Sequence, residues 1–291
     1  MSSLEKILSS ELCGNFLLQC FSEDCAGNDV TGNLLRQKNL HTELYIVARE
    51  EGVLSGASII KKGLAFTKWN NINFSQLIKD GDSFAQGQTI GVLKGSHCEL
   101  VSIERTVLNI LGHFSGIATC ARRYVLASNN IPIFDTRKTT PTLRTFEKYA
   151  CFCGGAQMHR ENLEAAVMIK DNHLIQGVSY FDQVNEMLSN VKNEKQLEFI
   201  EIEVDTVSQL EDFLVNKKCE VDIILLDNFS ISDLNHAVFL RDKYAPKIIL
   251  EASGGVTLKN IKAIAGTNVD RIATGAMVRE SSWIDIGVDW K

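Results

Sequence analysis

The sequence predicts an α/β protein in two parts, and three observations support this prediction. Residues 1 to about 103 combine a helical start with short strand-like runs and Gly/Asp turns. A long amphipathic stretch begins at residue 104, and apolar strands then alternate with helical stretches. We therefore expect a first domain over 1–103, joined by 276–291, and an α/β domain over 104–275.

The first part is expected to begin with a helix over residues 3–20. Three strand-like runs follow at residues 44–48, 52–60 and 88–96. Gly and Asp punctuate residues 79–88, as they commonly do in turns. Together these features predict a small α+β domain with an antiparallel sheet.

One long helix is expected over residues 104–128, because apolar side chains such as Val107, Leu111 and Phe114 recur there at helical spacing. His113 lies within this helix. We interpret it as a packing or surface histidine, because no second metal-binding residue type stands at matching helical spacing.

Six apolar, β-branched runs in the second part are expected to be strands, most of them separated by helical stretches. They are residues 131–135, 166–170, 198–204, 222–227, 247–253 and 270–274. Strands of this kind form parallel sheets covered by helices. The pattern by itself is compatible with either a barrel or a doubly wound layer.

The composition, with 45% hydrophobic and 23% charged residues, is that of a soluble globular protein. No apolar run is long enough to span a bilayer and no secretory signal is visible, so we expect a cytoplasmic protein without membrane contact. The eight cysteines are scattered, which favours reduced structural thiols.

The net charge of −6 argues against non-specific binding of nucleic acid. The charge is uneven, however, since residues 101–175 contain nine Lys or Arg and six Asp or Glu. A locally basic region in an acidic protein suits a small anionic ligand. The alternative for part of this region is a solvated helix face.

Polar or charged residues stand at the end of each predicted strand in the second part. In a barrel these ends meet on one face, where active sites of that architecture lie. One group is cationic, and Arg and Lys there suit carboxylates or phosphates. It consists of Arg137, Lys138, Arg160 and Lys170, with His159 and Arg105 as further candidates. His173 is expected to orient a neighbouring loop.

The other group is anionic and consists of Glu203 and Asp227. Carboxylates at adjacent strand ends can hold sugar hydroxyls and a hard metal ion such as Mg²⁺. The alternative for each acid is a helix N-cap or a strand-end salt bridge.

A candidate phosphate loop is Ser253-Gly254-Gly255, which follows a strand and precedes a helix-like stretch. Adjacent glycines let the backbone approach a phosphate, and a helix N-terminus favours negative charge. Gly275 follows the next strand and is a candidate for a second such loop, as at the last strands of barrel enzymes.

Several segments resemble the quinolinate phosphoribosyltransferase family. They are ERTVLNILGHFSGIAT (104–119), DTRKTTPTLRTFEKYA (135–150), GGAQMHRENL (154–163), MIKDNH (168–173), IEIEVD (200–205), LLDNF (225–229) and EASGGV (251–256). SEDCAGNDVT (22–31) is similar to the family's N-terminal signature. The resemblance covers about residues 20–280 with the motifs in family order, so no single motif carries it.

The resemblance implies an N-terminal α/β sandwich domain joined to an incomplete α/β barrel of parallel strands. It also implies transfer of the phosphoribosyl group of 5-phosphoribosyl-1-diphosphate (PRPP) to quinolinate, with Mg²⁺. The products would be nicotinate mononucleotide, pyrophosphate and CO₂, in de novo NAD biosynthesis. The implied assembly is a homodimer or a higher multiple.

The resemblance further implies a role for each candidate residue. Quinolinate would contact Arg137, Lys138, His159, Arg160 and Lys170, with Arg105 reaching into the partner subunit's site. Glu203 and Asp227 would hold Mg²⁺ and the ribose of PRPP, and Ser253, Gly254, Gly255 and Gly275 its 5-phosphate. Lys138, Lys170, Glu203 and Asp227 would be the catalytic residues.

Two segments depart from the family pattern: GGAQMHR replaces GGG-x-x-HR, and ATGAMVRES replaces S-x-G-x-x-T-H-S. Three alternatives remain, namely a related enzyme that uses a monocarboxylate such as nicotinate, the molybdenum-transport-associated branch, and a non-catalytic anion-binding protein. The dense basic cluster favours a dicarboxylate, because a single carboxylate would leave cations without a counterion. The intact DTRKT and IKDNH motifs argue against the molybdenum branch.

Overall fold

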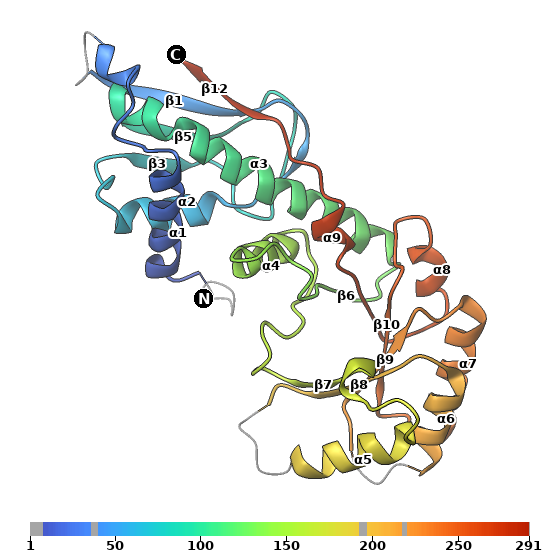
Figure 1. Ribbon diagram of the computed structural model, residues 1–291. Helices are drawn as coiled ribbons and strands as arrows, with labels where there is room; N and C mark the ends of the chain where they lie inside the picture. The colour runs from blue at the N-terminus through green and yellow to red at the C-terminus, as the bar shows by residue number, and fades with distance from the viewer. Residues whose placement is uncertain (1–7, 36–39, 192–196, 217–219, 291) are drawn as a thin grey trace. The chain divides into compact units, whose positions relative to one another are not determined.

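A computed structural model describes residues 8–35, 40–191, 197–216 and 220–290 (Figure 1). The chain divides into two compact units, one of residues 1–122, 140–155 and 280–291 and the other of residues 123–139 and 156–279. The sequence placed a single change at residue 104. In the structure, residues 140–155 also belong to the first unit. There the Arg122 guanidinium donates hydrogen bonds to the carbonyls of Gly81 and Gly154.

The first unit contains a four-stranded sheet in the order β12-β1-β5-β3, with antiparallel neighbours. Its strands are β1 (His41–Ala48), β3 (Asn73–Gln76), β5 (Thr89–Ser96) and β12 (Ile286–Trp290), and a separate pair is β2 (Gly52–Val53) with β4 (Ser83–Phe84). The predicted antiparallel sheet is therefore confirmed, and the C-terminal strand β12 pairs with β1.

The helices of this unit are α1 (Ser10–Glu23), η1 (Gly32–Leu34), α2 (Ala57–Phe66), α3 (His97–Ala127) and α4 (Arg144–Cys153). The long helix predicted over 104–128 is confirmed, although it begins seven residues earlier, at His97, and its last five residues belong to the second unit. Helix α1 begins after the N-cap Ser9, and residues 3–7 of the predicted helix lie outside the described residues.

The strand predicted over residues 52–60 is wrong beyond Val53, because the chain turns into helix α2. Gly56, with φ 102°, makes the turn, and both oxygens of the Asp80 carboxylate accept hydrogen bonds from the first amides of the helix, at Ala57 and Ser58. An apolar run this short does not distinguish a strand from a buried helix by periodicity.

The second unit is built on a six-stranded parallel sheet in the order β6-β11-β10-β9-β8-β7. The strands are β6 (Ile133–Phe134), β7 (Val167–Ile169), β8 (Ile200–Val204), β9 (Ile223–Asp227), β10 (Ile249–Ser253) and β11 (Arg271–Ala273). All six predicted strands are confirmed, each somewhat shorter than predicted. Within the described residues β6 and β7 are the edges, so the sheet is an open α/β barrel.

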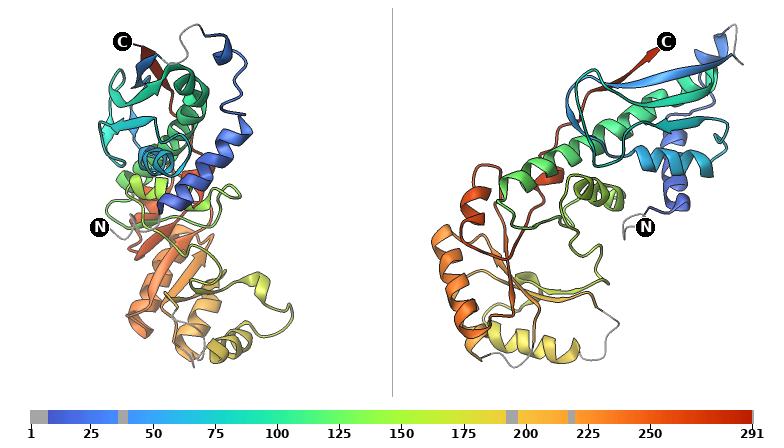
Figure 2. Two further views of the ribbon diagram at one scale, coloured as in Figure 1. Left: turned by 90° about the vertical axis from the view of Figure 1, so that its left-hand side faces the viewer. Right: turned by 180° about the vertical axis from the view of Figure 1, so that it is seen from behind.

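Helices alternate with these strands, as predicted. They are η2 (Asp171–His173), α5 (Tyr180–Asn190), α6 (Val207–Asn216), α7 (Ile231–Tyr244), α8 (Ile261–Ala265) and α9 (Ala276–Arg279). Helices α5 to α8 lie along the outer face of the sheet (Figures 1 and 2). Strand β9 is buried at Ile223 through Leu226, which accounts for its continuous apolar sequence. No helix in the described part of the chain is long and apolar enough to cross a membrane.

Candidate active site

A pocket of about 310 Å³ lies at the carboxyl ends of the parallel strands in the second unit. Its lining residues are Thr136, Arg137, Lys138, His159, Arg160, Met168, Lys170, Glu203, Leu225, Asp227, Glu251, Ser253 and Ala273. A wider hollow of about 540 Å³ lies at the amino ends of β9 and β10, away from these side chains. The charged groups predicted from the strand ends are thus brought together in one pocket.

Four predicted residues lie outside this lining. Gly254 and Gly255 directly follow Ser253, and Gly275 packs so closely on Lys138 that a Cβ there would lie 3.0 Å from the Lys138 Cβ. Arg105 belongs to the other unit, on α3, where its side chain is exposed.

The cationic side of the pocket includes Arg160, whose side chain is almost completely buried. Its Nη1 donates a hydrogen bond to the carbonyl of Ala166 at 3.2 Å. Burial lowers the pKa of Arg160, the nearby Arg137 lowers it further, and Glu201 opposes both effects. The like charges of the Arg137 and Arg160 guanidinium groups repel each other, so an anion bound between them is favoured.

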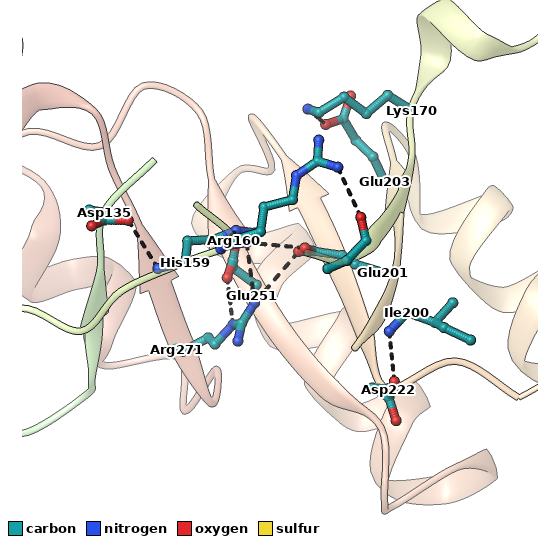
Figure 3. Close-up of polar contacts among 11 residues, drawn as sticks. Asp135, His159, Arg160, Lys170, Ile200, Glu201, Glu203, Asp222, Glu251 and Arg271 are labelled. Carbon is teal, nitrogen blue, oxygen red and sulfur yellow. Dashed lines mark hydrogen bonds and ion pairs between the residues drawn. The ribbon is translucent and has the colours of Figure 1, made fainter. Parts of the chain in front are cut away.

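Lys170 forms an ion pair with Glu203 across the ends of β7 and β8 (Figure 3). Burial raises the pKa of Glu203, the ion pair with Lys170 opposes this, and the charge of Asp227 adds to the rise. The backbone amide of Lys170 donates to Nδ1 of His173 at 3.0 Å, so His173 fixes the turn after β7. This is the loop-orienting role expected for it.

Asp205 joins Glu203 and Asp227, and sequence reasoning missed it. One carboxylate oxygen from each of the three lies within 4.8 Å of the others, close enough to hold a metal ion. Burial raises the pKa of Asp205, and Asp171 and Asp227 raise it further. Clustered carboxylates with oxygen ligands suit a hard divalent cation such as Mg²⁺. The signal was present, because Asp205 stands two residues after Glu203 in IEIEVD.

The glycine loop after β10 has backbone geometry that glycine favours. Gly254 has φ 79° and Gly255 has φ 59°, and a Cβ on Gly254 would lie 2.4 Å from Oδ1 of Asn228. The helix expected after this loop is present as α8 (Ile261–Ala265), but it does not follow the loop directly. Helix α8 begins only at Ile261, because the Asn260 side chain bonds to Thr257 and Gly255 and closes an extra turn.

A buried charge cluster lies at the floor of the pocket, and sequence reasoning did not identify it as a unit. It consists of His159, Glu201, Glu251 and Arg271 (Figure 3). Nε2 of His159 is 3.1 Å from Glu201 Oε2 and 3.6 Å from Glu251 Oε1, and Arg271 Nε is 2.5 Å from Glu251 Oε2.

The protonation of His159 reflects this setting. Burial lowers the pKa of His159, but hydrogen bonds to Glu201 and Glu251 outweigh burial and raise it to about 9. The amide of Arg160 donates to Nδ1 at 2.9 Å, which opposes a second proton on the ring. With Nδ1 as the acceptor, the ring proton lies on Nε2, between the two carboxylates.

Comparison with known proteins agrees with this architecture. Residues 29–115 match the model of the quinolinate phosphoribosyl transferase N-terminal domain, and residues 117–289 match that of the C-terminal domain. A probable nicotinate-nucleotide pyrophosphorylase (carboxylating) from Bacillus subtilis is 36% identical over 274 residues, covering 92% of this chain and 90% of that protein.

Two solved structures are similar over nearly their full length. The nicotinate-nucleotide pyrophosphorylase from Ehrlichia chaffeensis has a TM-score of 0.84 and 35% identity, covering 95% of this chain and 98% of that one. NadC from Streptococcus pyogenes has a TM-score of 0.86 and 30% identity, covering 97% of each chain. The chain belongs to the quinolinate phosphoribosyltransferase family.

Proposed function

We propose that this chain transfers the phosphoribosyl group of PRPP to quinolinate, yielding nicotinate mononucleotide, pyrophosphate and CO₂. The observation that carries the proposal is the division of one pocket into two chemistries. Arg137, Lys138 and Arg160 form a cationic side suited to a dicarboxylate. Glu203 and Asp227 form an acidic side next to the glycine loop, suited to the metal-bound sugar diphosphate.

The reaction follows from this division. The ring nitrogen of quinolinate attacks C1 of PRPP, the C1–O bond breaks, and pyrophosphate leaves with the bonding electrons. Glu203 and Asp227 stabilise the positive charge that develops on the ribose. The pyridinium product accepts the electron pair of the bond to the carboxylate beside nitrogen, so CO₂ leaves, and the ring carbon then takes a proton. Arg137 and Arg160 hold the substrate in place, and Lys138 and Lys170 supply further positive charge.

Mg²⁺ fits the acidic side, because Glu203, Asp227 and Asp205 offer three carboxylate oxygens within 4.8 Å of one another. When bound, the ion would neutralise charge on the departing diphosphate. Lys170 meanwhile pairs with Glu203. We propose that this ammonium turns to a substrate carboxylate when the acids take up the metal.

We propose quinolinate as the substrate, and not a monocarboxylate, because of the number of cationic side chains in the pocket. Arg137, Lys138 and Arg160 share the pocket wall, and a single carboxylate would neutralise only part of their charge. Purified protein should form nicotinate mononucleotide from PRPP, Mg²⁺ and quinolinate, and no product from nicotinate. Product from nicotinate alone would overturn this choice, and absence of product from both would overturn the proposed function.

We further propose that the enzyme is a homodimer or a higher multiple in which Arg105 serves the partner subunit's pocket. The side chain of Arg105 is exposed on α3, so it is available to a second subunit. Mixing inactive Arg105→Ala and Lys170→Ala proteins should restore activity, because hybrid dimers contain one intact site. Arg123→Ala, which changes an exposed arginine further along the same helix, should be active by itself. No recovery in exchanged mixtures would contradict a shared site.

The cytoplasm is the compartment we propose for this reaction. Five cysteines in the described part of the chain are free thiols, namely Cys13, Cys20, Cys25, Cys98 and Cys153, and Cys25 is exposed. Free thiols suit a reducing compartment. Activity that survives reduction unchanged and falls on oxidation would support this location, and a requirement for a disulfide would contradict it.

A further inference from the structure

In the buried cluster of His159, Glu201, Glu251 and Arg271, only His159 is expected to contact quinolinate, and the other three residues have no part in the reaction as written above. Glu201 and Glu251 are 0% exposed, His159 is 7% exposed and Arg271 is 8% exposed. Charged groups lose favourable hydration when buried, so a sheet interior seldom holds several of them. Departures of this kind gather at functional sites.

The strand register places the cluster at the floor of the pocket. Side chains two residues apart on a strand point to the same face of a sheet. The pairs are Glu201 and Glu203 on β8, Glu251 and Ser253 on β10, and Arg271 and Ala273 on β11. The second member of each pair lines the pocket, and so does Glu251. Glu251 and Arg271 are also direct neighbours in the β10–β11 register. The cluster therefore forms the floor of the pocket, with His159 and Glu251 at the pocket surface and Glu201 and Arg271 behind them.

His159 links this layer to the pocket. Its Nε2 is directed at Glu201 and Glu251, and its Nδ1 accepts a hydrogen bond from the amide of Arg160 at 2.9 Å. The amide of His159 itself donates to Oδ1 of Asp135 at 2.9 Å. Figure 3 shows His159 between Asp135, which is bonded to its backbone amide, and the two glutamates, which face its ring. Both ring nitrogens and the peptide on each side of His159 are thus fixed.

The orientation of Arg160 depends on this arrangement. Arg160 follows His159 directly, and the hydrogen bond from its amide to the His159 ring sets the direction in which its side chain leaves the backbone. A tilt of the ring would shift the guanidinium in the pocket, and a displacement of about 1 Å is enough to reduce an enzyme's rate substantially.

A metal ion is a poor alternative occupant of the cluster. His159, Glu201 and Glu251 offer ligand atoms within 4.8 Å of one another, as a metal site requires. The Arg271 guanidinium already lies against Glu251, however, and it stacks 4.4 Å from the centre of the Phe134 ring. A metal cation would have to share these carboxylates with a fixed positive charge, so the cluster is an internal ion network.

We propose that Glu201, Glu251 and Arg271 are positioning residues for quinolinate, acting through the ring of His159 on the guanidinium of Arg160. The inference rests on the proposed function and adds the determinant of its substrate geometry. PRPP is bound by other groups, so the cluster should affect one substrate and not the other.

The test is Glu251→Gln, which keeps the shape of the side chain and removes its charge. The KM for quinolinate should rise about tenfold, since a charge-assisted hydrogen bond to the network is lost. The KM for PRPP and kcat should stay within about threefold of wild type, which a general loss of folded protein would not produce. Calorimetric titration with quinolinate should show the same loss of affinity without turnover.

Asp270→Asn is the matched control. Asp270 is paired with the buried Arg241 and accepts the Leu250 amide at 2.7 Å, at the amino end of the sheet. Its loss should lower Tm and leave both KM values unchanged. If Glu251→Gln does not fold, the double variant Glu251→Gln with Arg271→Met is tested instead. It removes both charges of the ion pair, so neither partner is left buried without its counterion.

An unchanged quinolinate KM in the folded variant, or an equal rise in both KM values, would overturn the positioning role. So would a control that behaves like Glu251→Gln. Absence of product from the wild-type protein would instead overturn the proposed function, while calorimetric titration would still decide whether the cluster governs quinolinate binding.

Discussion

The ammonium of Lys170 lies against the carboxylate of Glu203, so a member of the cationic side of the pocket neutralises a member of the acidic side. Glu203 is almost completely buried, whereas Lys170 is about one-third exposed, so Lys170 is the partner that is freer to move. The two ligands of the proposed reaction need these groups separately, because a carboxylate attracts Lys170 and a metal ion attracts Glu203. In the proposed reaction, substrate binding therefore has to open this ion pair.

Lys170→Met should change the binding of the two ligands in opposite directions. Quinolinate use should fall about 100-fold, because one charged partner is lost. Binding of Mn²⁺, a spectroscopic substitute for Mg²⁺, should tighten several-fold, because the ammonium no longer competes for Glu203. Electron paramagnetic resonance measures the free ion directly. Lys247→Met, at the amino end of β10, is the charge-matched control, and weaker Mn²⁺ binding by Lys170→Met would contradict the account.

Asp227→Asn should raise the KM for PRPP by about tenfold or more, because one of the clustered metal-binding carboxylates is lost. The KM for quinolinate should change little. Asp222→Asn, at the opposite end of the same strand region, removes an equal charge from a residue that accepts the Ile200 amide at 2.7 Å. Equal effects of the two substitutions in steady-state kinetics would argue against a metal role for Asp227.

The sequence predicted the sheet of the second unit well, because each strand there has a continuous apolar run between helical segments. It also predicted the polar residues at the strand ends, since each directly follows its apolar run. Glu201 and Arg271 were not predicted as site residues because they lie within the strands. A charged residue within a strand is usually interpreted as an edge or surface position. Alternation within IEIEV was the available signal, since it puts Glu201 and Glu203 on one face.

The first unit was harder to predict, for a different physical reason. Helix α2 begins where the carboxylate of Asp80 accepts the amides of Ala57 and Ser58, a contact between residues more than twenty positions apart. Local propensity carries no information about such a distant cap. The return of residues 140–155 to this unit likewise depends on long-range hydrogen bonds from Arg122.

Gly254→Ala should weaken PRPP binding and lower stability by about 1–3 kcal/mol, because it combines a left-handed backbone with a steric clash. The added Cβ would lie 2.4 Å from Asn228 Oδ1 and 2.8 Å from its backbone nitrogen. Gly177→Ala is the control, since Gly177 has φ 82° but nothing within 4 Å of the added atom. Thermal unfolding and the KM for PRPP check this pair, and unchanged PRPP binding by Gly254→Ala would contradict a phosphate role.

Glu147 should contribute stability that depends on pH. Burial by itself would raise the pKa of Glu147, but hydrogen bonds from His113 and the Thr140 amide outweigh it and lower the pKa. A lowered carboxyl pKa gives stability that is present above the unfolded value of 4.5 and is lost as pH falls through the folded value. Glu147→Gln should therefore be about 1–3 kcal/mol less stable at pH 5.5, with a smaller difference below pH ~4.5.

Urea unfolding at several pH values measures this difference. Glu164→Gln, at an exposed position, should show no comparable dependence. A Glu147→Gln deficit that stays constant or grows as the pH falls would show that the charge of Glu147 is not the source of the stability.

The most direct test of the proposed function is the carbon balance of the reaction with quinolinate labelled by ¹³C in the carboxylate beside nitrogen. With PRPP and Mg²⁺ present, we predict equal amounts of labelled CO₂, pyrophosphate and unlabelled nicotinate mononucleotide, and no CO₂ when PRPP is left out. Mass spectrometry of the nucleotide and of the released gas provides the measurement. A nucleotide that retains the label, or CO₂ released without PRPP, would contradict the account.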